Sequence, residues 1–445
     1  MKRRDFLIRS SAALSTLAMG GMLPSLARAA ELNDRYFVFC YFEGGWDHLL
    51  GLDPRDPAVF TEAAVSETGI QPALHLLPSQ FSHQLVQAGP FTFGPCIGEL
   101  VNHTDSFSVI RGINMATLTH EVGRRYLITG QPPSGLQARG SSVASLCSSQ
   151  LGGNKPVPCL AHGVEAYSQN LPAYAAAMPV AAVGHLQYIL REDLGIPSVI
   201  RSNVKDALHS YWSKQFDCTL NRGVGGTELA NIYRANRERA RDLVNSQLYQ
   251  HFVFDSPQLA EIRAHYGFTA ANIESAYGRA ALAGQALKTG LSRVVSVALG
   301  AKLDTHDNSW RDQHSARLNE GFNALARLLE DLKTSEAPGG GSMLEKTTVF
   351  AFSEFGRTAM LNARNGRDHN LCNAAIIAGA GVVPGKIIGA SSDNGMGPEL
   401  IDLKTGIATS SGVSLKPEHV LSTVMHCAGL DASELKSESI APLIA

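Results

Sequence analysis

Short apolar runs alternate with amphipathic stretches along this chain of 445 residues. Five runs rich in β-branched and aromatic residues are typical of buried strands: 36–42, 107–111, 293–299, 347–352 and 374–378. Four longer stretches repeat their apolar residues with a period of about 3.6, which is typical of helices: 229–248, 273–287, 316–332 and 417–427. Strands that alternate with helices predict an α/β fold with a mostly parallel central sheet covered on both faces.

The interval from about residue 130 to 225 breaks this pattern. It is rich in Gly, Ser, Pro and Asn, and its apolar residues show only weak periodicity. Such a composition is typical of loops. We therefore expect this interval to form cap insertions over the sheet, within a single domain that spans residues 30–445.

The first 29 residues have the pattern of an export signal. Lys2-Arg3-Arg4 precedes a modest apolar segment at 11–23, and Ala27-Arg28-Ala29 supplies small residues before a cleavage point. Paired arginines followed by such a segment are typical of a twin-arginine signal. The apolar segment is shorter than the roughly 20 residues that span a bilayer. We expect a periplasmic or secreted protein that meets the twin-arginine translocon during export and has no transmembrane span when mature.

Composition and charge exclude several classes of function. Lys and Arg total 38 against 40 Asp and Glu, and the formal net charge is −2. The signal carries five of the basic residues and one acidic residue, so the mature charge is nearer −6. No basic field for nucleic acid remains, and an anionic substrate would depend on a local site. The seven cysteines are scattered without a CxxC pair, which excludes a zinc finger or a dense disulfide framework.

Polar residues cluster where the predicted strands end. The clusters are Glu43 to His48, Thr117 to Glu121, Asp304 to Asp307, Ser353 to Arg357, and the turn Gly366 to Asn370 before the fifth strand. Ligands bind beyond the carboxyl ends of strands in open α/β sheets. Each cluster also has a structural explanation: Asp47 suits a helix N-cap, Asp304 and His306 suit a turn, and Arg357 suits an exposed surface.

The convergence of carboxylates and imidazoles favours a metal site. The candidate ligands are Asp47, Asp304, His306, Glu354, Asp368 and His369. Their oxygens and nitrogens suit one or two divalent ions such as zinc, manganese or calcium. Two neighbouring ions can activate a nucleophile and neutralise a phosphoryl or sulfuryl oxygen. Arg124 and Arg357, together with Arg367, are candidates to hold the rest of such an anion.

These motifs also carry a resemblance. GGWD at 44–47, Thr119-His120 followed by a helix and Thr129-Gly130, LDTHDN at 303–308, FSEFGRT at 352–358 and GRDHN at 366–370 resemble the bacterial twin-arginine-exported domain-of-unknown-function family fifteen-oh-one. The tail segments IIAGAG at 376–381 and GKIIGA at 385–390 resemble the same family. The resemblance covers essentially the whole mature chain.

That family is similar to the alkaline phosphatase and sulfatase superfamily, which implies a doubly wound α/β/α sandwich with a metal site at the strand ends. By this resemblance Asp47 matches the metal aspartate after the first strand, and His369 matches the late metal histidine. Asp304 and His306 match the mid-chain metal pair. His120 takes the position of the sulfatase nucleophile, and Arg124 that of a characteristic active-site arginine.

Departures from the superfamily pattern leave the nucleophile open. Glu354-Phe355-Gly356 falls where the superfamily usually has Asp-His-Gly. Glu354 thus replaces the aspartate, and Phe355 replaces the metal histidine. His120 is not a Ser, Thr or Cys, and no Cys-x-Pro-x-Arg motif is present. Thr119 is a candidate hydroxyl nucleophile, with Thr117 a weaker one. His120 is a candidate nucleophile or general acid, and a site without any nucleophile is the third possibility.

The leading functional hypothesis is a metal-dependent hydrolase of phosphate or sulfate esters. Its substrate would be a small anionic ester or a sulfated or phosphorylated glycan. The alternative is a non-catalytic exported binding protein on the same scaffold, which Phe355 and the missing standard nucleophile favour. A lipase-like serine hydrolase lacks the G-x-S-x-G motif it would need.

Overall fold

The computed structural model describes residues 34–191 and 242–445, with a few single residues between 203 and 240. The predicted export signal and residues 229–239 and 241 of the predicted helix at 229–248 lie outside the described residues, while the described residues 240 and 242–245 are helical. Everything below concerns the described part of the chain.

A central sheet of eight strands organises the molecule, in the order β12-β4-β11-β8-β1-β7-β5-β6. The strands are β1 (Tyr36–Phe42), β4 (Phe107–Asn114), β5 (Cys159–His162), β6 (Met178–Val180), β7 (Val294–Gly300), β8 (Thr347–Phe352), β11 (Cys372–Gly379) and β12 (Ile387–Ile388). Neighbouring strands are parallel except where β11 pairs with β4 and β8. The five predicted strands and the mostly parallel sheet are therefore confirmed.

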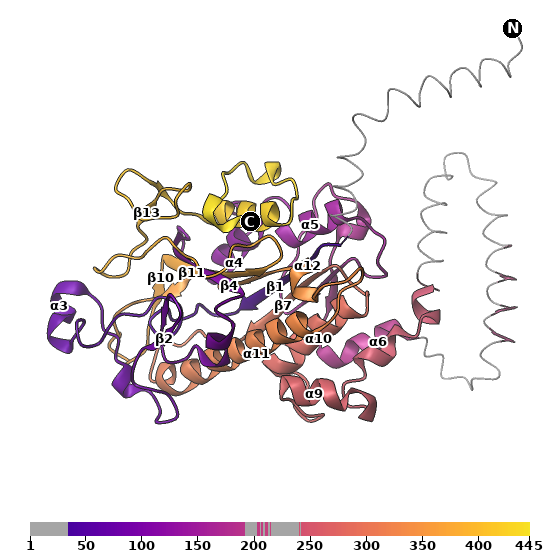
Figure 1. The fold of residues 1–445 in the computed structure, drawn as a ribbon, viewed down its shortest axis with the longest axis horizontal. Helices are drawn as coiled ribbons and strands as arrows, with labels where there is room; N and C mark the ends of the chain where they lie inside the picture. The colour runs from indigo at the N-terminus through magenta and orange to yellow at the C-terminus, as the bar shows by residue number, and fades with distance from the viewer. Residues whose placement is uncertain are drawn as a thin grey trace, which may run out of the picture.

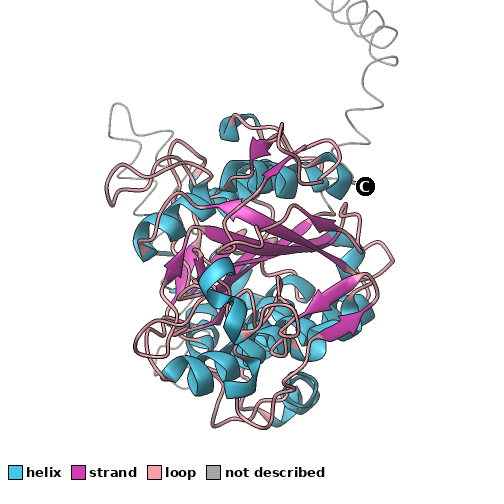
Figure 2. Ribbon diagram, turned by 90° about the vertical axis from the view of Figure 1, so that its left-hand side faces the viewer, coloured by secondary structure: helices cyan, strands magenta, loops and turns pink. Residues whose placement is uncertain are grey.

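Two helical layers cover the faces of this sheet (Figures 1 and 2). The long helices α10 (Ala276–Lys288) and α11 (Ser315–Thr334) lie on one face, and α4 (His120–Thr129), α5 (Val143–Leu151) and α13 (Pro417–Cys427) lie on the other. β1 shows why both layers are needed, because its side chains alternate between the two cores. Val38 and Cys40 pack with the α10 and α11 layer, while Phe37 and Phe39 pack with the α4 and α13 layer. The predicted α/β/α class is confirmed.

The remaining elements are short. The α-helices are α3 (Val65–Thr68), α6 (Leu186–Leu190), α9 (Ala260–Tyr266) and α12 (Met343–Lys346), and the small two-stranded sheets are β2 (Val86–Ala88) with β3 (Phe91–Phe93), β9 (Gly356–Arg357) with β10 (His369–Asn370), and β13 (Leu400–Ile401) with β14 (Val413–Ser414). Single helical turns are η1 (Glu62–Ala64), η2 (Leu74–Leu76), η3 (Gly98–His103), η4 (Ala173–Ala175), η5 (Val183–His185), η6 (Leu248–Phe252), η7 (Pro257–Leu259), η8 (Trp310–His314), η9 (Ser433–Leu435) and η10 (Ala441–Leu443).

The interval expected to form a cap contributes to the core instead. β5 pairs with β7 and β6 pairs with β5, so both strands extend the central sheet. α5 packs on the same face as α4 and α13. These elements are short, and their Gly- and Ser-rich connections hide them from a search for periodicity. The described part of this interval is therefore integral to the sheet.

The direction of β11 explains how the GRDHN turn reaches the site. β11 is antiparallel to its neighbours, with Cys372 opposite Asn114 and Ala375 opposite Phe352. The start of β11 therefore lies at the edge where the parallel strands end. A parallel strand would have carried the preceding turn to the opposite edge.

Within the described residues, no helix has the length and apolarity required to cross a bilayer. The six described cysteines are buried and unbridged. Cys40 and Cys372 are fully buried, as expected for core residues.

Candidate metal and active site

Three histidines surround one carboxylate oxygen at the carboxyl edge of the sheet. Oδ1 of Asp304, just beyond β7, lies 2.9 Å from His306 Nε2 and 3.2 Å from both His120 Nε2 and His369 Nε2. His120 begins α4, and His369 lies on β10 just before β11. Four side chains from segments up to 249 positions apart therefore meet at one point, as the sequence predicted for Asp304, His306 and His369.

Each of these imidazoles is oriented through its other nitrogen. The Nδ1 contacts are His120 to Glu354 Oε1 at 2.7 Å, His306 to Asp368 Oδ1 at 2.6 Å, and His369 to the Leu118 carbonyl at 2.6 Å. Carbonyl and carboxylate oxygens only accept hydrogen bonds, so each Nδ1 carries the proton. Each ring thereby presents Nε2 toward Asp304 Oδ1, where that nitrogen would be the coordinating atom if a cation were bound. This is the arrangement that histidines adopt around metal ions.

The distances fit a divalent cation. Ligand atoms of His120, Asp304 and His369 all lie within 4.8 Å of one another. Zn–N bonds of about 2.0–2.1 Å in a tetrahedral site place neighbouring ligand atoms roughly 3.3 Å apart. His306 Nε2 also lies 3.1 Å from His369 Nε2, where two lone pairs would repel each other unless a cation or a proton lay between them. The donor set therefore suits a metal ion.

Charges around Asp304 keep this carboxylate ionised. Burial would raise the pKa of Asp304, but the Arg357 guanidinium and His120 outweigh it and hold the pKa well below its usual range. Burial lowers the pKa of the His369 imidazole, which favours the neutral form that binds metals. The pKa of His120 is raised, because Glu354 and Asp304 outweigh the effect of its burial.

Glu354 supports His120 and does not face the centre. Its side chain is completely buried, and its Oε1 accepts hydrogen bonds from His120 and from the Gly44 amide at 2.8 Å. Oε2 accepts from the hydroxyls of Tyr41 and Ser353, both at 3.0 Å. Four donors occupy the acceptor sites of a carboxylate. The structure therefore places Glu354 behind a histidine, where the sequence had suggested a metal ligand.

Arg357 brings a fixed positive charge to the centre. Its guanidinium is buried, donates to Asp304 Oδ1 at 2.6 Å and lies 3.4 Å from His306 Nε2. Hydrogen bonds to the carbonyls of Gly44, Gly45 and Arg367 hold it in place. It is therefore part of the site and not an exposed surface cation.

Asp47 lies in a separate buried ion pair. Its Oδ2 is 2.8 Å from Arg367 Nε and accepts a hydrogen bond from Trp310 Nε1 at 2.7 Å. Its Oδ1 accepts from the amides of Leu49 and Leu50. Asp47 thus caps a turn and neutralises Arg367, and neither its contacts nor those of Arg367 reach the histidines. The expectation that Asp47 joins the metal site and Arg367 the anion site is not met. The Asp47 carboxylate and the Arg367 guanidinium form an ion pair with each other instead.

Three other residues that the sequence suggested for the site differ in exposure and in their contacts. Asp368 is half exposed and orients His306, while its Oδ1 also accepts from Asn362 Nδ2 at 3.0 Å. Thr119 is exposed and lies between Leu118, whose carbonyl holds His369, and His120. Arg124 lies one turn further along α4 and forms an ion pair with Glu165.

Sequence reasoning missed several residues that shape the site. The Phe355 ring is buried against His120 and His369, with centroid distances of 4.7 and 4.4 Å. Gly44 has φ +110°, and a Cβ there would lie 2.5 Å from the Asp304 amide nitrogen. Only glycine leaves room for this close contact between the two backbone segments. The paired glycines of the GGWD motif were the sequence signal for it. No sequence signal identifies the Leu118 carbonyl, because every residue has one.

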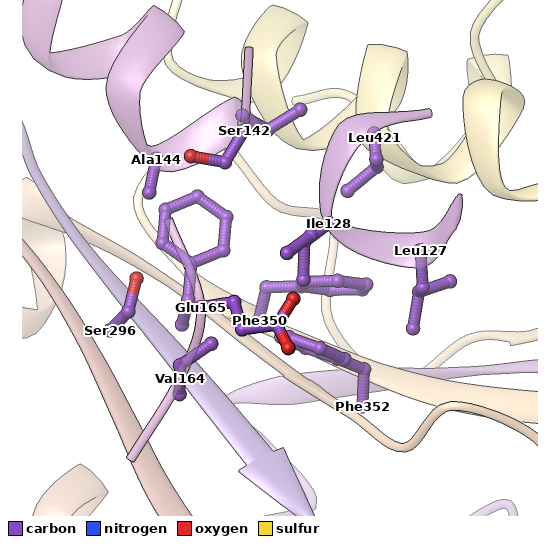
Figure 3. Close-up of a pocket in the computed structure, with 12 residues that line it drawn as sticks. Leu127, Ile128, Ser142, Ala144, Val164, Glu165, Ser296, Phe350, Phe352 and Leu421 are labelled. Carbon is purple, nitrogen blue, oxygen red and sulfur yellow. The ribbon is translucent and has the colours of Figure 1, made fainter. Parts of the chain in front are cut away.

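The cavity shown in Figure 3 is not a second ligand site. It lies in the apolar layer between the sheet and the helices of α4 and α13, next to Leu127, Phe350 and Leu421. Its volume of about 10 Å³ has room for a single water at most.

Comparisons with known proteins give a family match and several distant structural matches. A family model described as "Protein of unknown function (DUF1501)" matches residues 34–437. No curated protein matches the sequence. Twelve chains of known structure match, among them Ps i-CgsB in complex with k-i-k-neocarrahexaose, at 8% identity over 91% of this chain and 75% of that chain, with a TM-score of 0.35. Phosphonate monoester hydrolase SpPMH from Silicibacter pomeroyi matches at 10% identity over 92% of this chain and 76% of its own, also with a TM-score of 0.35.

Proposed function

The chain belongs to the DUF1501 family, and from that premise we propose that it is an exported, metal-dependent hydrolase of phosphate or sulfate esters. The observation that carries the proposal is the convergence of three imidazole Nε2 atoms on Asp304 Oδ1. Such a centre at the carboxyl edge of an α/β sheet suits an anionic ester better than an uncharged one.

The proposed ligands of the cation are Asp304, His120, His306 and His369. Three nitrogens and one oxygen suit zinc or manganese better than calcium, which prefers oxygen ligands. A bound divalent cation would neutralise developing charge on an ester oxygen and lower the pKa of a water molecule.

The same contacts favour one cation over two. Glu354 and Asp47 are the two buried carboxylates among the predicted ligands. Protein donors fill the acceptor sites of both. Arg357 already places a permanent positive charge beside Asp304 and His306. We therefore propose that the Arg357 guanidinium supplies the second positive charge of the site, in place of a second cation.

The surrounding residues divide the chemical work. The Arg357 guanidinium would donate hydrogen bonds to a phosphoryl or sulfuryl oxygen, since its planar fork matches such anions. Glu354, Asp368 and the Leu118 carbonyl hold the three imidazoles in their tautomers. The exposed hydroxyl of Thr119 is the candidate protein nucleophile, and water is the alternative.

Export by the twin-arginine route is part of the same proposal. It is supported by Arg3 and Arg4 ahead of the apolar segment and by the small residues before position 30. A protein that exchanges both arginines for lysine should remain inside the cell. Unchanged export of that variant would contradict this part of the proposal.

The activity is tested with the purified mature protein loaded with zinc or manganese. We expect hydrolysis of 4-nitrophenyl phosphate or 4-nitrophenyl sulfate by the wild type, and none by Asp304→Asn. Asp307→Asn is the matched control, because the exposed Asp307 side chain accepts its hydrogen bond from the nearby Ser309 amide and contacts none of the proposed ligands. A folded, metal-loaded wild type that hydrolyses neither ester would contradict the proposal.

A further inference from the structure

A cavity of about 430 Å³ opens at the carboxyl ends of β1, β5 and β6. Tyr41 and Glu43 line it from β1, Arg124 from α4, and Val164 and Glu165 from the segment after β5. Ligand pockets of small molecules have about this volume. The cavity therefore has room for a ring-sized group.

The cavity adjoins the candidate metal centre. The Tyr41 hydroxyl, in its wall, donates to Glu354, which in turn accepts from His120. Arg124 lies four residues after His120, so both side chains project from the same side of α4. A substrate whose ester group lies at the histidines would extend its remaining part toward this cavity.

The charges of the lining do not favour a second anion. Glu165 forms ion pairs with Arg124 and Arg125, and its pKa is lowered because Tyr167 and these arginines outweigh its burial. No ion pair within the described residues engages Glu43, whose side chain is exposed at the rim. Glu165 is shared by two arginines, and the exposed Glu43 balances the positive charge that remains, so the lining offers no net positive charge to a second anion.

The other lining groups suit a polyhydroxylated ring. Val164, Pro179 and Val180 present apolar surface, whereas the exposed Glu43 carboxylate presents acceptors and the partly exposed Arg124 guanidinium presents donors. A sugar-like ring has apolar C–H faces and hydroxyl groups that both donate and accept hydrogen bonds. The match is to the alcohol part of an ester, not to its anionic group.

We propose that this cavity binds the uncharged, hydroxyl-bearing leaving group of the substrate and discriminates against alcohols that carry a second negative charge. The proposal rests on the proposed ester hydrolase function. It names the substrate class as monoesters of neutral polyols.

Two variants test the cavity without touching the metal centre. Ala181→Phe places a ring at the mouth of the cavity, and Ala181 is exposed, so the core is undisturbed. Glu43→Gln removes the lining carboxylate that no ion pair within the described residues engages. Ala58→Phe is the control, because Ala58 is an exposed alanine that does not line the cavity.

Calorimetry of zinc-loaded protein would compare glucose 6-phosphate with 6-phosphogluconate, which adds a carboxylate to the same carbon chain. We expect glucose 6-phosphate to bind several-fold more tightly to the wild type, and Ala181→Phe to weaken it roughly tenfold. Glu43→Gln should reduce the discrimination, and Ala58→Phe should change nothing. Equal binding of both sugars, no binding, or unchanged binding by Ala181→Phe would overturn the proposal.

Hydrolysis of 4-nitrophenyl phosphate separates this outcome from the proposed function. 4-Nitrophenolate is a good leaving group without ring hydroxyls, so its release depends on the metal centre more than on hydrogen bonds in the cavity, and Ala181→Phe should retain measurable hydrolysis of this ester. Binding of glucose 6-phosphate without any hydrolysis would contradict the hydrolase and leave the cavity assignment standing. Hydrolysis of the aryl ester together with equal binding of the two sugars would support the hydrolase and contradict the cavity assignment.

Discussion

Nε2 of His306 and Nε2 of His369 lie 3.1 Å apart, and both face Oδ1 of Asp304. Nδ1 of His306 donates to Asp368, and Nδ1 of His369 donates to the Leu118 carbonyl. Two ring nitrogens and a carboxylate oxygen this close together need a proton or a cation between them, and one cation can satisfy all three atoms at once. This relationship is the strongest physical reason to place a cation beside Asp304.

Glu354 should control metal affinity through His120. We expect Glu354→Gln to weaken zinc binding by about 10- to 100-fold, because the supporting carboxylate fixes the tautomer and orientation of the ligand. Competition with a chelator measures the affinity. Glu121→Gln, an exposed change on the same helix, should leave it unchanged, and equal affinity in both variants would refute the role of Glu354.

Asp47 should matter for stability and not for metal binding. Asp47→Asn leaves the buried Arg367 without its partner, which costs about 3–5 kcal/mol in comparable pairs. Denaturant unfolding measures this loss. The double variant Asp47→Asn with Arg367→Met should lose less than the two single changes together.

Metal content of Asp47→Asn distinguishes the two roles directly. The folded variant should bind as much zinc as the wild type, because the Asp47 oxygens face Arg367, Trp310 and backbone amides. Loss of the metal without loss of stability would restore Asp47 as a ligand.

His314 should make the protein sensitive to acid. Burial lowers the pKa of His314 to about 4, from 6.5, and the flanking Arg357 and Arg367 lower it while Asp47 and the Leu303 carbonyl raise it. The unfolded chain therefore binds a proton that the folded chain excludes. The stability associated with neutral His314 is complete above pH 6.5 and is lost as the pH falls toward 4, by about 3 kcal/mol.

Unfolding free energies between pH 7 and 4.5 test this assignment. His314→Gln should flatten the acid dependence, and the exposed His75→Gln should not. The same slope in His314→Gln and the wild type would show that His314 does not contribute.

Arg357 should contribute to turnover more than to metal loading. Arg357→Met removes the guanidinium that would bind the anionic group, and we expect kcat to fall on the order of a hundredfold. Metal content, measured on the same sample, should remain near the wild-type value because all four proposed ligands persist. An unchanged kcat would contradict the role assigned to Arg357.

Apolar patterning predicted the five main strands and the helices at 273–287, 316–332 and 417–427, since these elements are long and their buried faces follow a clear period; most of the fourth predicted helix, at 229–248, lies outside the described residues. It missed β5, β6 and β12, which are two to four residues long. Buried pairing of such short strands leaves no periodic signal. The antiparallel direction of β11, which brings His369 to the site, depends on tertiary packing and not on local sequence.

The site was predicted in its residue types more than in its contacts. Asp304, His306 and His369 meet as expected, and His120 joins them although the resemblance had suggested a nucleophile or acid. Asp47 and Glu354 belong to buried networks, which depend on Arg367 and on Tyr41 as partners. The sequence shows which carboxylates are present but not which groups they contact. A carboxylate that orients another side chain therefore cannot be distinguished from one that binds the metal.

Elemental analysis of the purified protein tests the central claim most directly. After incubation with zinc or manganese and removal of free metal, we predict about one equivalent of divalent metal per chain in the wild type. His369→Ala should lose most of it while retaining the fold, and Asp307→Asn should keep it. A folded wild type that holds no metal, or a His369→Ala variant that holds as much as the wild type, would contradict the account.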